Sequence, residues 1–292
     1  MSAFLKGRAA LPILVAVALV CFAANSLLAR AALASGDAGP AAFTAMRLTS
    51  GAAALMLAVK LTGRPLRGGV AISAVSGLAL FVYAAAFSFA YVALDPGLGA
   101  LALFGAVQIT MFAGALVGGE RPALARWAGG AAAFSGLAVL VAPGEAGPPA
   151  MPAALMGLAG AAWGFFSLRG RRTRDPLANT AGAFLAAAPA GLLLWLAEGL
   201  EEPISPRGAA LALASGALAS GAGYAIWYAA LPRLEASLAA VLQLAVPLIA
   251  LFGGVLWLGE AATLRFGLAA LLILGGVGAA TLSRRRRPGG RA

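Results

Sequence analysis

The chain has 292 residues, of which 62% are hydrophobic and only 11% are charged, whereas soluble domains have about 45–50% apolar and about 25% charged residues. This composition excludes a soluble globular protein, and the unbroken apolar stretches exclude a β-barrel, whose strands alternate with period two. The formal charge of +11 does not indicate nucleic-acid binding, because the basic residues lie in short segments between apolar stretches, as they do in membrane proteins.

Ten apolar stretches follow one another along the chain, each about the length of a helix that crosses a bilayer. Turn residues such as Gly39-Pro40 and Asp95-Pro96-Gly97 separate them. We therefore predict an all-α integral membrane protein with ten transmembrane helices, and short breaks near Glu120 and Arg233 leave nine or eleven as alternatives. The predicted helices cover residues 9–29, 40–60, 69–92, 98–118, 123–142, 151–169, 178–197, 208–231, 235–258 and 262–282.

The distribution of basic residues predicts the orientation of these helices. With a cytoplasmic N-terminus, most of the 21 basic residues, including the cluster at 284–287, fall on the cytoplasmic side. The opposite side then holds only Arg30, Arg207 and Arg265, while Arg47 lies inside a span. Cytoplasmic loops of membrane proteins are enriched in Lys and Arg. We therefore expect a multi-pass protein of the bacterial inner membrane with both termini in the cytoplasm.

An internal repeat divides the chain into two halves. A shift of 140 residues aligns Phe104–Glu120 with Leu244–Glu260, and six of the 17 aligned pairs are identical. We predict a first five-helix repeat at 1–147, a second at 148–283 and a basic cytoplasmic tail at 284–292. Because each repeat has an odd number of helices, the second copy enters the membrane from the other side, and such inverted repeats place a substrate site near the midplane. This arrangement favours transport.

Several short motifs carry a family resemblance that covers essentially the whole chain. In the second half they are Ala229-Ala230-Leu231, the run 235–240, the run 243–247, Leu258-Gly259-Glu260 and Gly275-Gly276-Val277. In the first half the weaker matches are Arg47, Gly119-Glu120-Arg121 and Gly129-Gly130. These residues resemble an EamA-type transporter of the drug/metabolite transporter (DMT) superfamily, and the resemblance implies ten helices in two inverted repeats. The first half departs from the pattern, since Val107 aligns with Pro247.

Within the superfamily, the sequence most resembles the aromatic amino acid exporter branch, on its overall character and the aromatic residues in its spans. The resemblance implies a secondary transporter that exports or facilitates the movement of amino acids, aromatic and other neutral ones, by alternating access through a central cavity. Other small metabolites or drugs are the alternative cargo.

Polar and aromatic side chains near the middle of the spans are the candidate substrate ligands. Such side chains cost free energy in lipid unless they meet one another, water or a substrate. Hydrogen bonding between helices is an equally weighted alternative for each Gln or Asn. The predicted substrate-binding residues are Asn25, Tyr83, Gln108, Trp163, Tyr224 and Gln243. Pro247, followed by Gly253 and Gly254, is the candidate hinge, because proline removes a backbone hydrogen bond.

Arg47 is the only full charge well inside a span. It lies about 10 Å from the outer end of its helix at 1.5 Å rise per residue. Its two interpretations are attraction of a substrate carboxylate at the external mouth and a structural role, of which we favour the structural one. Glu120 is expected to pair locally with Arg121 or to cap a helix.

A membrane enzyme that modifies lipids is the less favoured alternative. Histidine is absent and Cys21 is the single cysteine, whereas such enzymes use clustered His, Asp or Glu for metal binding or acid–base work. We therefore expect no catalytic residues, metal or cofactor. The expected partners are a small-molecule substrate and the lipid bilayer, with no nucleic acid, and a monomer is favoured over an oligomer.

Overall fold

The computed structural model describes residues 10–63, 70–94, 96–141, 150–171, 173, 175–198, 201–258 and 264–282. Apart from an isolated bridge between Ala38 and Ile204, the regular structure of these residues is helical. The elements are α2 (Ala10–Leu33), α3 (Pro40–Leu61), α4 (Val70–Ala93), α5 (Pro96–Val117), α6 (Leu124–Val141), α7 (Ala150–Gly170), α8 (Pro176–Ala197), α9 (Pro206–Ala214), the π-helix η1 (Ser215–Ala222), α10 (Gly223–Ala230), the 3-10 turn η2 (Leu231–Arg233), α11 (Ala236–Gln243), α12 (Ala245–Leu258) and α13 (Leu264–Leu282).

The predicted all-α class is confirmed for the described residues, and each of the predicted ranges contains a helix. Within the described ranges, six helices are long and apolar enough to cross a membrane, and three shorter apolar helices accompany them. Crossing by all ten segments and their inverted arrangement stay predictions. So does the division of the chain, because residues 142–149 and 283–292 lie outside the described residues.

Three helices begin in the way their sequences predict. Proline occupies the first position of α3, α8 and α9, where a missing backbone N–H costs nothing. The residues before two of these prolines cap the helix: Asp175 accepts a hydrogen bond from the amide of Ala178 at 3.2 Å, and Ser205 accepts one from Gly208 at 3.0 Å. These caps fix the points at which α8 and α9 start.

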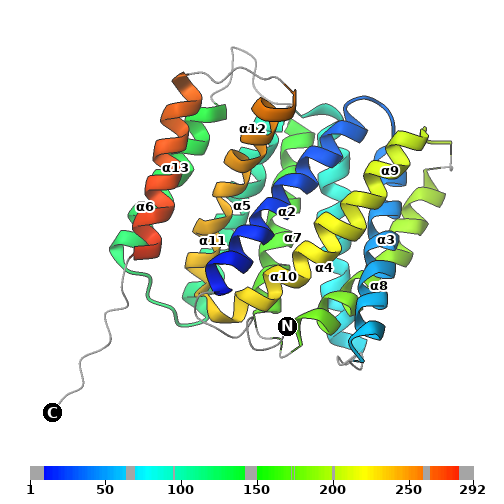
Figure 1. The fold of residues 1–292 in the computed structure, drawn as a ribbon, viewed down its shortest axis with the longest axis horizontal. Helices are drawn as coiled ribbons and strands as arrows, with labels where there is room; N and C mark the ends of the chain where they lie inside the picture. The colour runs from blue at the N-terminus through cyan, green and yellow to red at the C-terminus, as the bar shows by residue number, and fades with distance from the viewer. Residues whose placement is uncertain are drawn as a thin grey trace.

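The helices pack into one bundle in which the two predicted halves interlock (Figure 1). Helix α6 packs against α13 at one edge of the bundle, and α3 packs against α8 and η1 at the other. Between them, α4 and α5 pack against α7, while α2 packs against α10 and α12. Gly129 and Gly276 bring α6 and α13 together, since a Cβ on either would overlap the backbone of the other.

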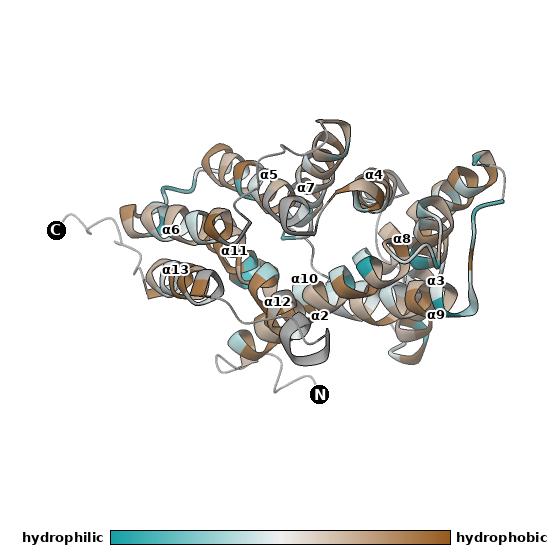
Figure 2. Ribbon diagram, turned by 90° about the horizontal axis from the view of Figure 1, so that it is seen from above, coloured by the Kyte–Doolittle hydropathy of each residue, from teal (hydrophilic) through white to brown (hydrophobic). Residues whose placement is uncertain are grey.

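Large apolar side chains cover the outside of the bundle. Leu193, Ile109, Leu218 and Leu271 are each more than 60% exposed. Seen from above, apolar colour spreads over the helices around the outline (Figure 2). A soluble monomer gains by burying large apolar side chains, whereas a bundle surrounded by lipid has no reason to hide them.

Candidate functional site

A small cavity lies at the centre of the bundle, between α2, α4, α5, α7, α10 and α12. Its volume is about 20 Å³, which is room for about one water molecule and not for an amino acid. Four of the predicted substrate ligands, Asn25, Tyr83, Trp163 and Tyr224, line it together with Phe22. The structure therefore brings together four of the predicted residues, from four helices that are distant along the chain.

Aromatic rings form most of the wall and fill the centre. The ring centroid of Trp163 lies 4.6 Å from that of Tyr224 and 5.2 Å from those of Phe22 and Tyr83. The ring of Phe22 meets Trp163 and Tyr224 edge to face, an arrangement that aromatic pairs prefer. The cavity is small because these rings pack against one another, so a larger ligand requires them to separate.

Arg47 lies at the polar end of this cluster with only 1% of its surface exposed. Its Nη2 donates to the hydroxyls of Tyr224 at 2.8 Å and Tyr83 at 3.2 Å, and its Nε donates to Oγ of Ser220 at 3.0 Å. Its carbon Cζ also lies 5.1 Å from the centre of the Tyr83 ring, a cation–π distance. The structure therefore places Arg47 directly behind two cavity-lining tyrosines.

Ser220 connects Arg47 to Asn25. Because a guanidinium only donates hydrogen bonds, the Ser220 oxygen accepts from Arg47 and its single proton points to Asn25 Oδ1, 3.3 Å away. Ser215 donates to the same oxygen at 2.5 Å. The carbonyl of the Asn25 amide is thereby occupied, which leaves its NH₂ group as the part available to the cavity.

The π-helix η1 explains how two serines five residues apart reach one oxygen. In an α-helix, Ser215 and Ser220 would be about 140° apart around the axis, whereas the i→i+5 bonding of a π-helix brings them to one face. Gly216 allows η1 to touch α3, because a Cβ there would overlap the carbonyl of Arg47. Sequence reasoning missed η1, although Ser-Gly recurs at a spacing of five residues in 215–221.

Gln243 lies behind the cavity and is fully buried. Its Oε1 accepts a hydrogen bond from the indole N–H of Trp163 at 2.6 Å. Its amide nitrogen lies 3.2 Å from the sulfur of Met111 and 3.2 Å from the carbonyl oxygen of Ala239. Gln243 therefore positions Trp163 in this structure and does not line the cavity.

Gln108, the sixth predicted ligand, lies at a different place. It lines a larger apolar groove of about 280 Å³ between α5 and α6, together with Phe112 and Trp127. Its Oε1 is buried and has no hydrogen-bond partner in the part of the chain that the structure describes. The structure does not bring Gln108 together with the central cavity.

The predicted hinge residues all fall in α12. The helix is interrupted at Leu244, which separates α11 from α12, and Pro247 follows three residues later. Proline cannot donate to the carbonyl of Gln243 four residues earlier, which accounts for the interruption. Gly253 and Gly254 continue as helix beyond it.

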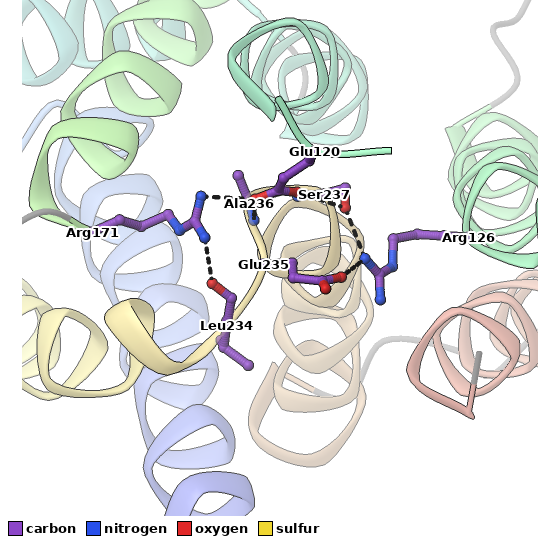
Figure 3. A network of polar contacts seen from close by, with 7 residues as sticks. All are labelled: Glu120, Arg126, Arg171, Leu234, Glu235, Ala236 and Ser237. Atoms are coloured by element: carbon purple, nitrogen blue, oxygen red, sulfur yellow. Dashed lines mark hydrogen bonds and ion pairs between the residues drawn. The ribbon is translucent and has the colours of Figure 1, made fainter. Parts of the chain in front are cut away.

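A network of polar contacts joins the segments around α5, α6, α7 and α11 at one end of the bundle (Figure 3). Glu120, after α5, accepts hydrogen bonds from the amides of Ala236 and Ser237 at 2.8 and 3.3 Å, and so caps α11. Arg171, at the end of α7, donates to Glu120 at 2.9 Å and to the carbonyl of Leu234 at 2.8 Å. The ion partner of Glu120 is thus Arg171 and not the adjacent Arg121 expected from the sequence.

The same network includes a second ion pair, between Arg126 and Glu235 (Figure 3). Arg126 also donates to the hydroxyl of Ser237 at 3.1 Å. Burial pushes the pKa of Glu120 up, but the hydrogen bonds from Ala236 and Ser237 and the charge of Arg171 outweigh it and hold the pKa below its ordinary value. Glu120 is therefore ionised at neutral pH. We call the contacts of Glu120, Arg171, Arg126 and Glu235 the Glu120 network.

A second network closes the opposite end of the bundle, where α2 turns into α3 and α8 leads to α9 (Figure 1). Asp37 accepts hydrogen bonds from Ser205 at 2.8 Å and Ser35 at 2.7 Å, and it pairs with Arg207 at 2.9 Å. Glu202 accepts bonds from the first amides of α3, the nearer at 2.6 Å. The hydrogen bonds from Ser35 and Ser205 hold the pKa of Asp37 below its ordinary value. These contacts are the Asp37 network.

The described residues hold no group of three or more His, Cys, Asp or Glu placed to bind a metal ion. The site presents hydrogen-bonding, charged and aromatic groups. Its parts are a small aromatic cavity, a buried cation behind two tyrosines, and a polar network at each end of the bundle.

Comparisons with known proteins agree with this picture. The sequence pattern of the EamA-like transporter family matches residues 150–282. The uncharacterised protein PA1977 of Pseudomonas aeruginosa is 49% identical over 270 residues, which are 91% of this chain and 92% of its own. One solved crystal structure is 22% identical to this chain, and the match covers 96% of this chain and 100% of the other. The two superpose with a TM-score of 0.80, so they share a fold.

The family match supports a place in the drug/metabolite transporter superfamily and suggests a membrane transporter of small molecules. The many apolar helices agree with a multi-pass membrane protein. The chain thus belongs to one family with the Pseudomonas aeruginosa protein, and its second half matches the EamA-like transporter family.

Proposed function

We propose that the protein carries amino acids, aromatic and other neutral ones, across the bacterial inner membrane by alternating access through the central cavity. The observation that carries the proposal is the cavity itself, which is lined by Trp163, Tyr83, Tyr224 and Asn25. Aromatic rings with polar edges suit a substrate that has an apolar body and a polar head. The finer assignment to amino acids also follows the resemblance to the aromatic amino acid exporter branch.

The pairing of helices supports the inverted repeat on which alternating access depends. A two-fold axis between the halves would relate each span to the span five places later in the chain. It would exchange the contact between α4 and α7 with the contact between α10 and α2. It would also exchange the contact between α5 and α7 with the contact between α12 and α2. It would map the α3–α8 and α6–α13 contacts onto themselves. All of these contacts occur, and they join the two halves. Rocking of one half against the other would open the cavity alternately to each side.

The cavity volume of about 20 Å³ implies that binding is coupled to a conformational change. A ligand the size of phenylalanine enters only when the rings around Trp163 separate, so at least one of the two end networks has to break. Alternating access would therefore pass through a compact arrangement like this one, with wider arrangements on either side of it.

The test is saturable flux of radiolabelled phenylalanine into proteoliposomes that contain only this protein, with unlabelled amino acids as competitors. We expect competition by tryptophan and other neutral amino acids, and loss of flux in Trp163→Ala. Trp195→Ala, on α8 and away from the cavity, is the matched control and should retain flux. Absence of flux for every amino acid, with and without a proton gradient, would refute the amino-acid assignment and leave other small metabolites or drugs as the cargo.

A further inference from the structure

The guanidinium of Arg47 is a buried positive charge without a negative partner. Its hydrogen-bond acceptors are three neutral hydroxyls, and none of the described acidic residues forms an ion pair with it. Its Nη1 is buried and has no hydrogen-bond partner among the described residues. A buried charge costs free energy unless it is both paired and hydrogen-bonded. An anion placed near Arg47 would supply the negative charge that these neutral contacts do not.

The polar groups on the cavity wall are available chiefly as donors. The Tyr83 and Tyr224 oxygens already accept from Arg47, so each hydroxyl has its own proton to give. The Tyr224 hydroxyl also lies 3.4 Å from that of Tyr83, which is a long contact. Asn25 uses its carbonyl oxygen for Ser215 and Ser220, and its NH₂ group remains. A ligand atom at this end of the cavity meets N–H and O–H groups, so the chemistry favours an acceptor.

The charge of Arg47 strengthens these donors. A hydroxyl that accepts a hydrogen bond from a cation becomes a better donor, because hydrogen bonds in a chain polarise one another. Tyr83 and Tyr224 therefore transmit the positive charge from Arg47 to the cavity surface. Hydrogen bonds to an ionised acceptor are about twice as strong as neutral ones, so the arrangement discriminates an anion from a neutral acceptor of the same shape.

We propose that Arg47, Tyr83 and Asn25 form a recognition site for the carboxylate of an amphipathic organic acid whose apolar body lies among Phe22, Trp163 and Tyr224. The inference deepens the proposed function. It rests on that function in one respect, namely that the bound organic acid is also the molecule that is transported. It requires a carboxylate and makes no use of an amino group, because the described cavity-lining side chains include no acid.

The test compares three probes of one shape, 3-phenylpropionate, 3-phenylpropionamide and 3-phenylpropylamine, on the purified full-length protein in detergent. Ligand-induced stabilisation is followed by thermal unfolding at pH 7.5 and constant ionic strength. We expect the acid to bind about tenfold to a hundredfold more tightly than the amide, the range for a hydrogen bond to a buried charge, and the amine to bind no better than the amide. Equal binding of acid and amide would overturn the proposal, and so would equal stabilisation by sodium chloride.

Two variants and one control test whether the preference for the acid arises at this site. Tyr83→Phe removes one donor hydroxyl and should weaken the acid more than the amide, because a hydrogen bond to an ionised acceptor is about twice as strong as one to a neutral acceptor. The preference for the acid should therefore fall several-fold. Tyr91→Phe, two helical turns along α4 and outside the cavity lining, is the matched control and should bind all probes as the wild type does. Arg47→Gln should abolish the preference, and if it does not fold, the probe series on the wild type still decides the question.

This outcome is separable from that of the flux experiment. Amino-acid flux with equal competition by phenylalanine and phenylalaninamide would retain the proposed function and reject the carboxylate site. Preferential binding of 3-phenylpropionate without any amino-acid flux would retain the carboxylate site and reject the proposed cargo.

Discussion

Gln243 holds the indole of Trp163 through a hydrogen bond of 2.6 Å between Nε1 and Oε1. Both residues have almost no exposed surface, but only Trp163 lines the cavity. The bond joins α7 to the end of α11, immediately before the interruption at Leu244. Movement of α11 is therefore coupled to the position of the ring that fills the cavity.

Gln243→Leu should destabilise the protein and reduce flux. The substitution leaves the indole N–H of Trp163 buried without an acceptor, which costs about 1–3 kcal/mol. Thermal unfolding in detergent measures the stability, and the flux assay measures the consequence for transport. Gln108→Leu is the control, because the Oε1 of Gln108 already has no partner; that variant should be neutral or stabilising. A destabilisation that is no larger in Gln243→Leu than in Gln108→Leu would contradict the positioning role.

Gly216→Ala should disrupt the contact between η1 and α3. A Cβ at this position overlaps the carbonyl of Arg47 and the hydroxyl of Ser50, and overpacking of this kind costs about 1–3 kcal/mol. Because Ser215 and Ser220 flank the contact, we also expect weaker binding of substrate. Gly157→Ala on α7 has nothing within 4 Å of its new methyl group and should be neutral or slightly stabilising. Comparison of the two unfolding midpoints tests the packing argument.

Depth along the predicted spans was enough to find much of the cavity wall. Asn25, Tyr83, Trp163 and Tyr224 meet because polar and aromatic groups near the midplane gather where they avoid lipid. Depth does not fix the rotation of a helix about its axis, however. That rotation depends on packing, and it places Gln108 in the groove beside α6 and Gln243 behind Trp163.

Contacts between segments that are distant along the chain cannot be predicted from the sequence, for a different reason. Nothing in the residues around Glu120 indicates that its partners are Arg171 and the first amides of α11, because those contacts arise only when the helices have packed. The π-helix has a local signal in the five-residue recurrence of Ser-Gly, but a helical period of 3.6 residues is the usual expectation. The contact of Ser220 with Asn25 depends on the π-helical geometry of η1, so an α-helical period does not predict it.

Glu120→Gln should open the end of the bundle that the Glu120 network closes. The substitution removes the ion pair with Arg171 and weakens the cap on α11. Ala239, one turn into α11, is fully buried, so Ala239→Cys in a Cys21→Ser background reports opening through its labelling by N-ethylmaleimide. We expect labelling several-fold faster than with Glu120 intact. Glu198→Gln, at the exposed end of α8, should leave the labelling rate unchanged, and an equal acceleration there would point to general loosening.

The pH dependence of stability provides a separate test of the Glu120 network. Because the pKa of Glu120 is lowered below 4.5 in the folded protein, its stabilising contribution is fully present above the unfolded value and is lost as pH falls through the folded pKa. The difference in unfolding midpoint between wild type and Glu120→Gln should therefore be constant from pH 5.5 to 8 and should shrink as the pH drops below about 4.5. A difference that already declines between pH 8 and 6 would mean that the carboxylate is not held in its ionised form by Arg171 and the α11 amides. The network would then be a pH-sensitive contact at neutral pH, contrary to the geometry in Figure 3.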